Sequence, residues 1–140
     1  MIVLDTDCLS LLERERSLEA SNLLAALDQH RAEEICTTII SFEEQMRGWL
    51  SFIARCKNLD EQVAGYERLH RFLESYCNTP VIDFDEKAAK VFAELKARKI
   101  RIGTMDLKIA SIVIANRGLL VTRNLSDFEQ VPGLIAEDWT

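Results

Sequence analysis

The chain has 140 residues, of which 48% are hydrophobic and 29% are charged, and it carries a net charge of −6 at pH 7. This length fits one domain, which we expect to span residues 1–140 and to bury a core of ordinary size. No stretch approaches the roughly 20 apolar residues of a membrane span. The acidic balance argues against tight, indiscriminate binding to nucleic acid, because such affinity comes mainly from neutralising phosphates.

The cysteines and the first residues of the chain indicate the cellular compartment of the protein. The first apolar run begins at Met1 without a basic region or a cleavage-type segment, so we expect a cytoplasmic protein. Four cysteines are widely separated and form no Cys-x-x-Cys pair: Cys8, Cys36, Cys56 and Cys77. We expect buried free thiols rather than zinc ligands or disulfides. His30 and His70 lack a His or Cys at ligand spacing, and we expect both at the surface.

Short branched apolar runs alternate with helical patterns along the chain. Strands are predicted at residues 2–5, 35–40, 80–84 and 119–122, with a short fifth at 134–136. Helices are predicted at 17–30, from Ser41 onward, and at 60–76, 86–99 and 104–116, with Asp85 as an N-cap and Gly118 as a C-cap. This alternation predicts an α/β fold in which a parallel sheet has helices on both faces.

Three acidic residues, Asp5, Glu44 and Asp106, each stand where an apolar run that reads as a strand gives way to a predicted helix. The carboxyl ends of parallel strands share one edge of a sheet, so residues far apart in sequence can meet there. Crowded carboxylates repel one another unless a cation joins them, and Mg²⁺ or Mn²⁺ prefers oxygen ligands of this kind. The pattern predicts a magnesium-dependent phosphodiesterase site.

Each of these acids also has a purely structural explanation. Asp5 can cap the segment that follows it, and Asp106 is favoured by the dipole at a helix N-terminus. Glu44 completes a Ser41-Phe42-Glu43-Glu44 capping box. Three more polar residues are either ligands or turn formers: Asp7, Asn124 and Asp127. The repetition of the pattern, rather than any single acid, favours function.

Four segments, in this order, resemble PIN-domain proteins, specifically the VapC-type toxins of bacterial toxin–antitoxin pairs. They are Ile2-Val3-Leu4-Asp5-Thr6-Asp7, Ser41-Phe42-Glu43-Glu44-Gln45-Met46-Arg47-Gly48, Thr104-Met105-Asp106-Leu107-Lys108-Ile109-Ala110, and Val121-Thr122-Arg123-Asn124 with Asp127-Phe128. The second segment is similar to the family's Thr-x-x-Glu-Leu-x-x-Gly stretch, and counting back from Gly48 selects Glu44 over Glu43. The C-terminal signature continues through Val131-Pro132-Gly133-Leu134 and Trp139.

The resemblance implies a three-layer α/β/α sandwich with a central, mostly parallel sheet of four to five strands. It also implies a Mg²⁺- or Mn²⁺-dependent endoribonuclease that acts as the toxin of a type II toxin–antitoxin system. Asp5 and Asp106 would bind the metal, while Glu44 and Asn124 would hold its waters. Relatives typically form homodimers and are inhibited by a small antitoxin whose tail covers the active-site groove.

Two positions depart from the family pattern. Asp7 stands where relatives usually have Asn, which bears on metal occupancy and on the protonation of its neighbours. Gln45 stands where they usually have Leu, which we expect to alter packing only.

Basic and apolar residues near the acids suggest further contacts. A basic cluster surrounds Asp106: Lys96, Arg98, Lys99, Arg101 and Lys108. Candidates for gripping an RNA backbone are Arg123, Lys108 and Arg47. Trp49, Phe52 and Ile53 offer an apolar surface to a partner, although core packing explains them equally well.

Two alternative functions remain open. The Leu4-Asp5-Thr6-Asp7 opening resembles that of haloacid-dehalogenase-type phosphatases, but Leu9 stands where that family has Thr or Val, and its Gly-Asp-x-x-x-Asp segment is absent. The second alternative is a non-catalytic PIN-fold binding module, against which the intact acids argue.

Overall fold

A five-stranded parallel sheet forms the centre of the computed structural model, which describes residues 1–14 and 16–140. Its strands are β1 (Ile2–Leu4), β2 (Ile35–Thr38), β3 (Val81–Ile82), β4 (Leu119–Val121) and β5 (Ile135–Glu137). They lie in the order β3-β2-β1-β4-β5, and each neighbouring pair is parallel. The predicted sheet of four to five strands is confirmed.

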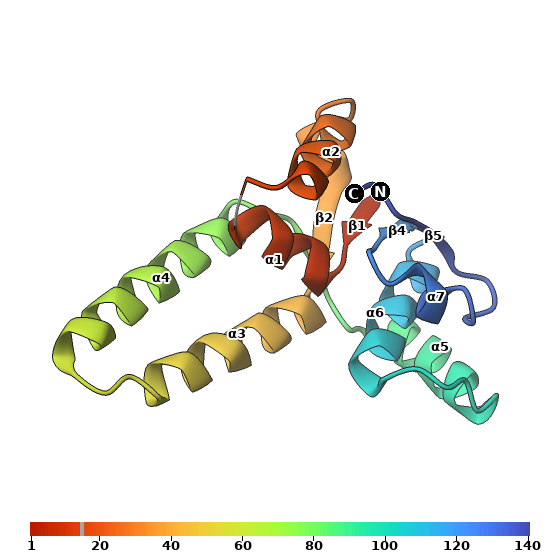
Figure 1. The fold of residues 1–140 in the computed structure, drawn as a ribbon. Coiled ribbons are helices and arrows are strands. Elements are labelled where there is room, and N and C mark those ends of the chain that lie inside the picture. Colours follow the sequence, from red (N-terminus) through yellow and green to blue (C-terminus); the bar gives the residue numbers. More distant parts are fainter. Residues whose placement is uncertain (15) are drawn as a thin grey trace.

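Helices connect and flank these strands (Figure 1). They are α1 (Thr6–Arg14), α2 (Leu18–Leu27), α3 (Ile39–Ala54), α4 (Leu59–Cys77), α5 (Glu86–Ala97), α6 (Thr104–Ala115) and the short α7 (Leu125–Phe128), with a 3₁₀ turn at Ala32–Glu34 before β2. Within the described residues, no helix is both long and apolar enough to cross a bilayer.

The core lies on both faces of the sheet. Successive residues of a strand point to opposite faces, so Val3 of β1 packs into a cluster with α5 and α6 while Ile2 and Leu4 pack toward α1 and α2. Helix α6 contributes buried residues around much of its circumference, as its nearly continuous apolar sequence predicts. The three-layer α/β/α sandwich is therefore confirmed.

Helices α3 and α4 form an antiparallel arm that extends away from the sandwich (Figure 1). Aromatic rings of Phe42, Phe72 and Tyr76 pack together on it, with ring centroids 4.9–5.5 Å apart. Gly65 of α4 faces α3, where a Cβ would lie 3.3 Å from the Ile53 side chain. The small glycine therefore lets the two helices approach closely.

Two predicted element boundaries are wrong at functionally relevant places. Strand β2 ends at Thr38, and α3 begins at Ile39 with Thr38 as its N-cap, because the Thr38 hydroxyl accepts the Ser41 N–H at 3.1 Å. The run 100–105 before Asp106 is not a strand; it contains the end of the α5–α6 connection and the start of α6. Glu44 and Asp106 thus lie in the early turns of helices rather than directly at strand ends.

The end of α6 also differs from expectation. Asn116 is the C-cap, Arg117 adopts the left-handed conformation (φ 53°), and Gly118 donates its N–H to Val113 O. A Cβ on Gly118 would lie 3.3 Å from the Val3 side chain, so glycine allows close packing against β1 there. Asp85 is confirmed as the N-cap of α5, with its carboxylate accepting the Ala88 N–H.

The expected helix after Asp5 is confirmed as α1, for which no bounds were predicted, whereas the short α7 was not predicted. The expectation of buried free thiols is correct for Cys8 and Cys36, which lie in the core, but wrong for Cys77, which is exposed at the end of α4; Cys56 is partly buried. His30 and His70 are exposed as predicted; His30 stacks on Trp139 with centroids 5.3 Å apart.

Candidate active site

Residues from four parts of the chain line a pocket of about 420 Å³ beyond the carboxyl end of β1. Three of them are the predicted acids Asp5, Glu44 and Asp106. The rest of the lining consists of Thr6, Asp7, Ser10, Arg14, Asn124 and Phe128. The fold therefore brings the four predicted site residues, which are spread over 120 positions of sequence, into one cavity.

Asp5 combines the structural and the candidate functional roles. One carboxylate oxygen, Oδ1, accepts the Cys8 N–H at 2.7 Å and so caps α1, while the residue as a whole is only 5% exposed. Burial raises the pKa of Asp5, and hydrogen bonds from Thr122 and Cys8 partly oppose that shift. The cap explanation is correct for this oxygen, and Oδ2 has no such role in capping.

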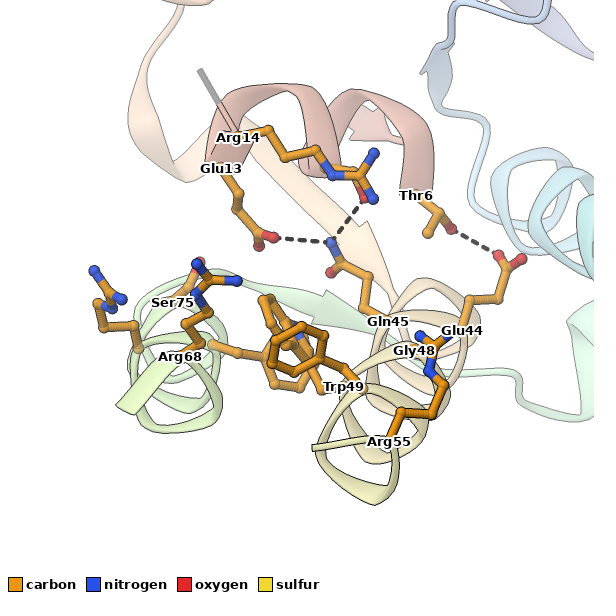
Figure 2. Close-up of a pocket in the computed structure, with 14 residues that line it drawn as sticks. Thr6, Glu13, Arg14, Glu44, Gln45, Gly48, Trp49, Arg55, Arg68 and Ser75 are labelled. Atoms are coloured by element: carbon orange, nitrogen blue, oxygen red, sulfur yellow. Dashed lines mark hydrogen bonds between the residues drawn. The ribbon is translucent and has the colours of Figure 1, made fainter. Parts of the chain in front are cut away.

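Glu44 is held by a partner on another helix. Its Oε1 accepts a hydrogen bond from the Thr6 hydroxyl at 2.7 Å, which Figure 2 shows as the contact between α3 and α1. Since Thr38 caps α3, the capping-box explanation for Glu44 is wrong. Glu43 instead pairs with Arg47 and does not line the pocket.

The pKa of Asp106 shows the effect of the neighbouring acids on one carboxyl group. Burial, together with the negative charges of Glu44, Asp5 and Asp127, raises its pKa to about 6. Its position in the first turn of α6 favours the charged form, but this does not offset the crowding. The carboxylates are therefore close enough to disfavour one another's ionisation.

Asn124 and Asp127 form a turn after β4 and also approach the acids. The Asn124 side-chain amide donates to Asp127 Oδ2 at 2.8 Å, and its backbone N–H donates to Thr122 Oγ1 at 2.9 Å. Asn124 lines the pocket, and Asp127 contributes to the raised pKa of Asp106. Asn124 is thus the N-cap residue of α7 and Asp127 lies in its first turn, with their polar groups beside the candidate site.

The predicted basic contacts are mostly engaged elsewhere. Arg123 lies 3.0 Å from Glu19 and 3.7 Å from Asp7, and Arg47 pairs with Glu43. Lys108 places its ammonium 5.9 Å from the centre of the Phe84 ring. None of Arg123, Arg47 and Lys108 lines the acidic pocket or the groove beside it.

That neighbouring groove, of about 800 Å³, runs between α1 and the α3–α4 arm (Figure 2). It shares Thr6, Ser10, Arg14 and Glu44 with the acidic pocket. Its other basic residues, Arg55, Arg68 and Arg71, were not predicted to act together. The signal available in the sequence was helical spacing, because residues three and four positions apart lie on one face of a helix. Arg68, Arg71 and Ser75 have this spacing on α4. Gln45, Gly48, Phe52 and Arg55 have it along α3 and its C-cap.

The donor set of the pocket suits a hard divalent cation. Carboxylate and amide oxygens converge there, and a cation would relieve the repulsion that raises the pKa of Asp106. Among the described residues, no three acidic, His or Cys side chains are already close enough together to enclose an ion. Because carboxylate and amide oxygens line this pocket, its residues fit an ion held by one or two carboxylates and by water, as is usual for Mg²⁺.

Comparison with known proteins assigns the family. The PIN domain family model matches residues 2–134, and the chain belongs to this family. Ribonuclease VapC2 of Rickettsia felis is 40% identical over 63 residues, which cover 42% of this chain and 47% of that protein. The tRNA(fMet)-specific endonuclease VapC of Salmonella typhimurium is 41% identical over 64 residues, which cover 42% and 48%. In these alignments the chain spans about half the length of each relative.

A solved structure extends the likeness over the whole chain. It is the crystal structure of VapBC2 from Rickettsia felis bound to a DNA fragment from their promoter, with a TM-score of 0.74, 28% sequence identity and 100% coverage of both chains. PIN-family membership argues against the phosphatase alternative, which belongs to a different family.

Proposed function

We propose that this protein is a divalent-metal-dependent endoribonuclease, the toxin of a type II toxin–antitoxin pair, acting in the cytoplasm. The observation that carries the proposal is the single pocket lined by Asp5, Glu44 and Asp106, in which burial and the neighbouring negative charges raise the pKa of Asp106 to about 6. Ribonuclease and endonuclease relatives support the reaction class. The VapBC2 neighbour supports a cognate antitoxin as a partner. A homodimer is part of the same proposal.

Asp5 and Asp106 are proposed to hold Mg²⁺ or Mn²⁺, with Glu44 and Asn124 binding its waters. When bound, such an ion activates water for attack on a phosphodiester and offsets charge that grows on the phosphate oxygens. Thr6 fixes Glu44 through its 2.7 Å hydrogen bond, and Asp127 fixes the Asn124 amide. The cap on Cys8 fixes Asp5 in the same way. These contacts keep the oxygen atoms turned into one pocket.

The test is RNA cleavage with Mn²⁺ or Mg²⁺ by the wild-type protein and by Asp5→Asn and Asp106→Asn. We expect each variant to lose more than about a hundredfold in rate, since even residues that only position a ligand are worth about 10- to 100-fold. Asn retains the capping ability of Asp5, so the fold should persist. Asp83→Asn is the matched control, because Asp83 follows β3, is exposed and does not line the pocket.

Three outcomes would contradict the proposal. Wild-type protein that leaves transfer, ribosomal and messenger RNA uncut in the presence of Mn²⁺ would favour the non-catalytic binding module. A variant that cuts RNA at the wild-type rate would show that the substituted residue does not contribute to cleavage. Hydrolysis of a small phosphomonoester, without RNA cleavage, would restore the phosphatase alternative.

A further inference from the structure

Four arginines line the groove between α1 and the α3–α4 arm: Arg14, Arg55, Arg68 and Arg71. Arg14 lies on α1, Arg55 is the C-cap of α3, and Arg68 and Arg71 lie on α4; all four are exposed. We call this the arginine groove. In a chain with a net charge of −6, the gathering of four cations in one concavity is a local reversal of the overall charge.

These arginines differ from those elsewhere on the surface. Arg31, Arg47 and Arg123 each pair with a carboxylate. By contrast, within residues 1–14 and 16–140, none of the four groove arginines has a carboxylate oxygen within 4.0 Å. Glu13 also lines the groove, but its carboxylate accepts from Gln45, and burial raises its pKa. The groove therefore presents guanidinium groups to whatever enters it.

Aromatic faces lie between the arginines. Trp49 and Phe52 are partly buried and meet edge to face, with centroids 6.0 Å apart and ring planes at 82°. Arg68 lies over the Phe52 ring, 5.5 Å from its centre. Beside them Gly48 has open space, since a Cβ there would find no atom within 4 Å. Guanidinium groups that alternate with aromatic faces are the means by which proteins bind the backbone and bases of single strands.

The groove opens directly into the acidic pocket, with which it shares Thr6, Ser10, Arg14 and Glu44. From Glu44 to Arg55 the axis of α3 rises by about 16 Å, at 1.5 Å per residue. A strand whose phosphate lay at the acids could therefore continue along the arm for several nucleotides. Duplex bases are stacked and paired, whereas an aromatic floor needs bases that are free to splay out.

We propose that the arginine groove binds the single-stranded RNA on one side of the scissile phosphate, with Arg55 and Arg68 on phosphates and Trp49 under a base. This inference rests on the proposed function for the identity of the cleaved strand. The groove explains how a protein with a negative net charge binds RNA, because the arginines that contact phosphates lie together in one groove that leads to the acidic pocket. It also limits the substrates to RNA with an unpaired segment beside the cut.

The direct test is binding of a labelled single-stranded oligoribonucleotide in EDTA, where no cleavage occurs, followed by fluorescence anisotropy over a range of salt concentrations. For Arg55→Gln/Arg68→Gln we expect binding at least tenfold weaker, and a salt dependence shallower by about 1.4, because each phosphate contact to a single strand contributes about 0.7. Arg55→Lys/Arg68→Lys should keep most of the slope, since it keeps both charges. Trp49→Leu should weaken binding about tenfold without changing the slope.

The matched control is Lys87→Gln/Lys90→Gln. Both lysines are exposed on α5, on the side of the sheet away from the arm, and the double variant makes the same change in net charge (Figure 1). With Mn²⁺ present, the groove variant should raise KM for RNA cleavage with little change in kcat. An unchanged affinity and slope in the groove variant, or an equal loss in the lysine variant, would overturn the proposal.

Two further outcomes separate this inference from its premises. If wild-type protein cuts no RNA, the proposed function fails, but binding in EDTA that depends on Arg55 and Arg68 would still support the groove as a single-strand site. If the groove variant binds RNA like wild type and instead escapes inhibition by its antitoxin, the groove is a protein-docking site. In that case the proposal is wrong.

Discussion

At the scale of one residue, the raised pKa of Asp106 shows how burial among other acids affects the stability of the fold. Its pKa is raised from an ordinary value of 3.8 to about 6, first by burial and then by Glu44, Asp5 and Asp127. A carboxyl group whose pKa is higher in the folded protein binds its proton more tightly there than in the unfolded chain. Ionisation of Asp106 therefore opposes folding above about pH 6, and this opposition disappears as the pH falls toward 4.

Asp106→Asn should consequently stabilise the metal-free protein at neutral pH. A shift of this size corresponds to at most about 3 kcal/mol. Because the side chain is only partly buried, we expect solvent screening to reduce the gain to about 1–2 kcal/mol. Urea unfolding in EDTA should show the gain at pH 7.5 and its absence near pH 4, where both states of the wild-type group are protonated.

Asp83→Asn, at an exposed position outside the pocket, should show no comparable gain. An Asp106→Asn protein that is no more stable than wild type at neutral pH would mean that the acids do not crowd one another in solution.

The residue types and their order could be predicted from sequence, but the local contacts could not. The position of Asp5 could be predicted, because an Asp directly after an apolar run marks both the end of a strand and the cap of the segment that follows. The choice between Ser41 and Thr38 as the cap of α3 depends on where β2 ends, since a hydroxyl at either position offers the same chemistry. That choice decides whether Glu44 is bound by its own helix or is free to reach Thr6.

At the scale of elements, Gln45 joins α3 to both of its neighbours. Its Nε2 lies 3.3 Å from Ser10 Oγ and 3.3 Å from Glu13 Oε2 on α1, and Figure 2 shows the contact with Glu13. Its Oε1 accepts the Tyr76 hydroxyl of α4 at 2.6 Å. The prediction that Gln45 alters packing only is therefore wrong. Its amide links the three helices that border the arginine groove, and the preceding residue, Glu44, contacts Thr6 of α1.

Tyr76→Phe tests this bridge. The substitution leaves the carbonyl oxygen of the buried Gln45 without its donor, so we expect a loss of about 1–2 kcal/mol in the free energy of unfolding. Tyr66→Phe on the same helix is the matched control, because Tyr66 is 57% exposed, and its change should stay within about 0.5 kcal/mol. Equal effects of the two substitutions, measured by urea unfolding, would show that the bridge does not couple the helices.

Elements could be delimited from sequence where the pattern has one physical explanation, and could not where it has two. The apolar run of α6 and the branched run of β1 each have one physical explanation: burial between helices and sheet. Helix α1 is nine residues long and starts with Thr6 and Asp7, which are equally suited to a turn. The arginine groove was invisible for a different reason, because it depends on how α1 packs against the α3–α4 arm.

At the scale of the whole molecule, the strand order places the centre of the sheet beneath the acids. The central strands β1 and β4 end in Asp5 and in the Thr122–Asn124 turn, and α3 and α6 bring Glu44 and Asp106 to the same edge. A parallel sheet thus assembles the pocket from chain segments that no local pattern connects. The convergence was predictable from the alternation of strands and helices, whereas the spacing of the oxygen atoms was not.

A bound cation should therefore stabilise the entire fold. With Mn²⁺ at about a hundred times its dissociation constant, the wild-type protein should gain about 2.7 kcal/mol over the protein in EDTA. For a domain of this size that gain corresponds to a rise in Tm of roughly 5–15 °C. The rise should shrink near pH 5, because the metal must then displace the proton that Asp106 holds with a pKa of about 6.

Asp106→Asn should lose most of this Mn²⁺-dependent rise in Tm, because it removes a proposed ligand, whereas Asp83→Asn should keep it. The urea and thermal experiments together distinguish the two substitutions. Compared with Asp83→Asn, Asp106→Asn should be more stable to urea in EDTA but should show a smaller rise in Tm with Mn²⁺. An equal thermal shift in wild type and Asp106→Asn would place the cation elsewhere on the molecule. No shift at all at millimolar Mn²⁺ would leave the acids as a strained cluster without a metal, and the hydrolytic mechanism would lose its basis.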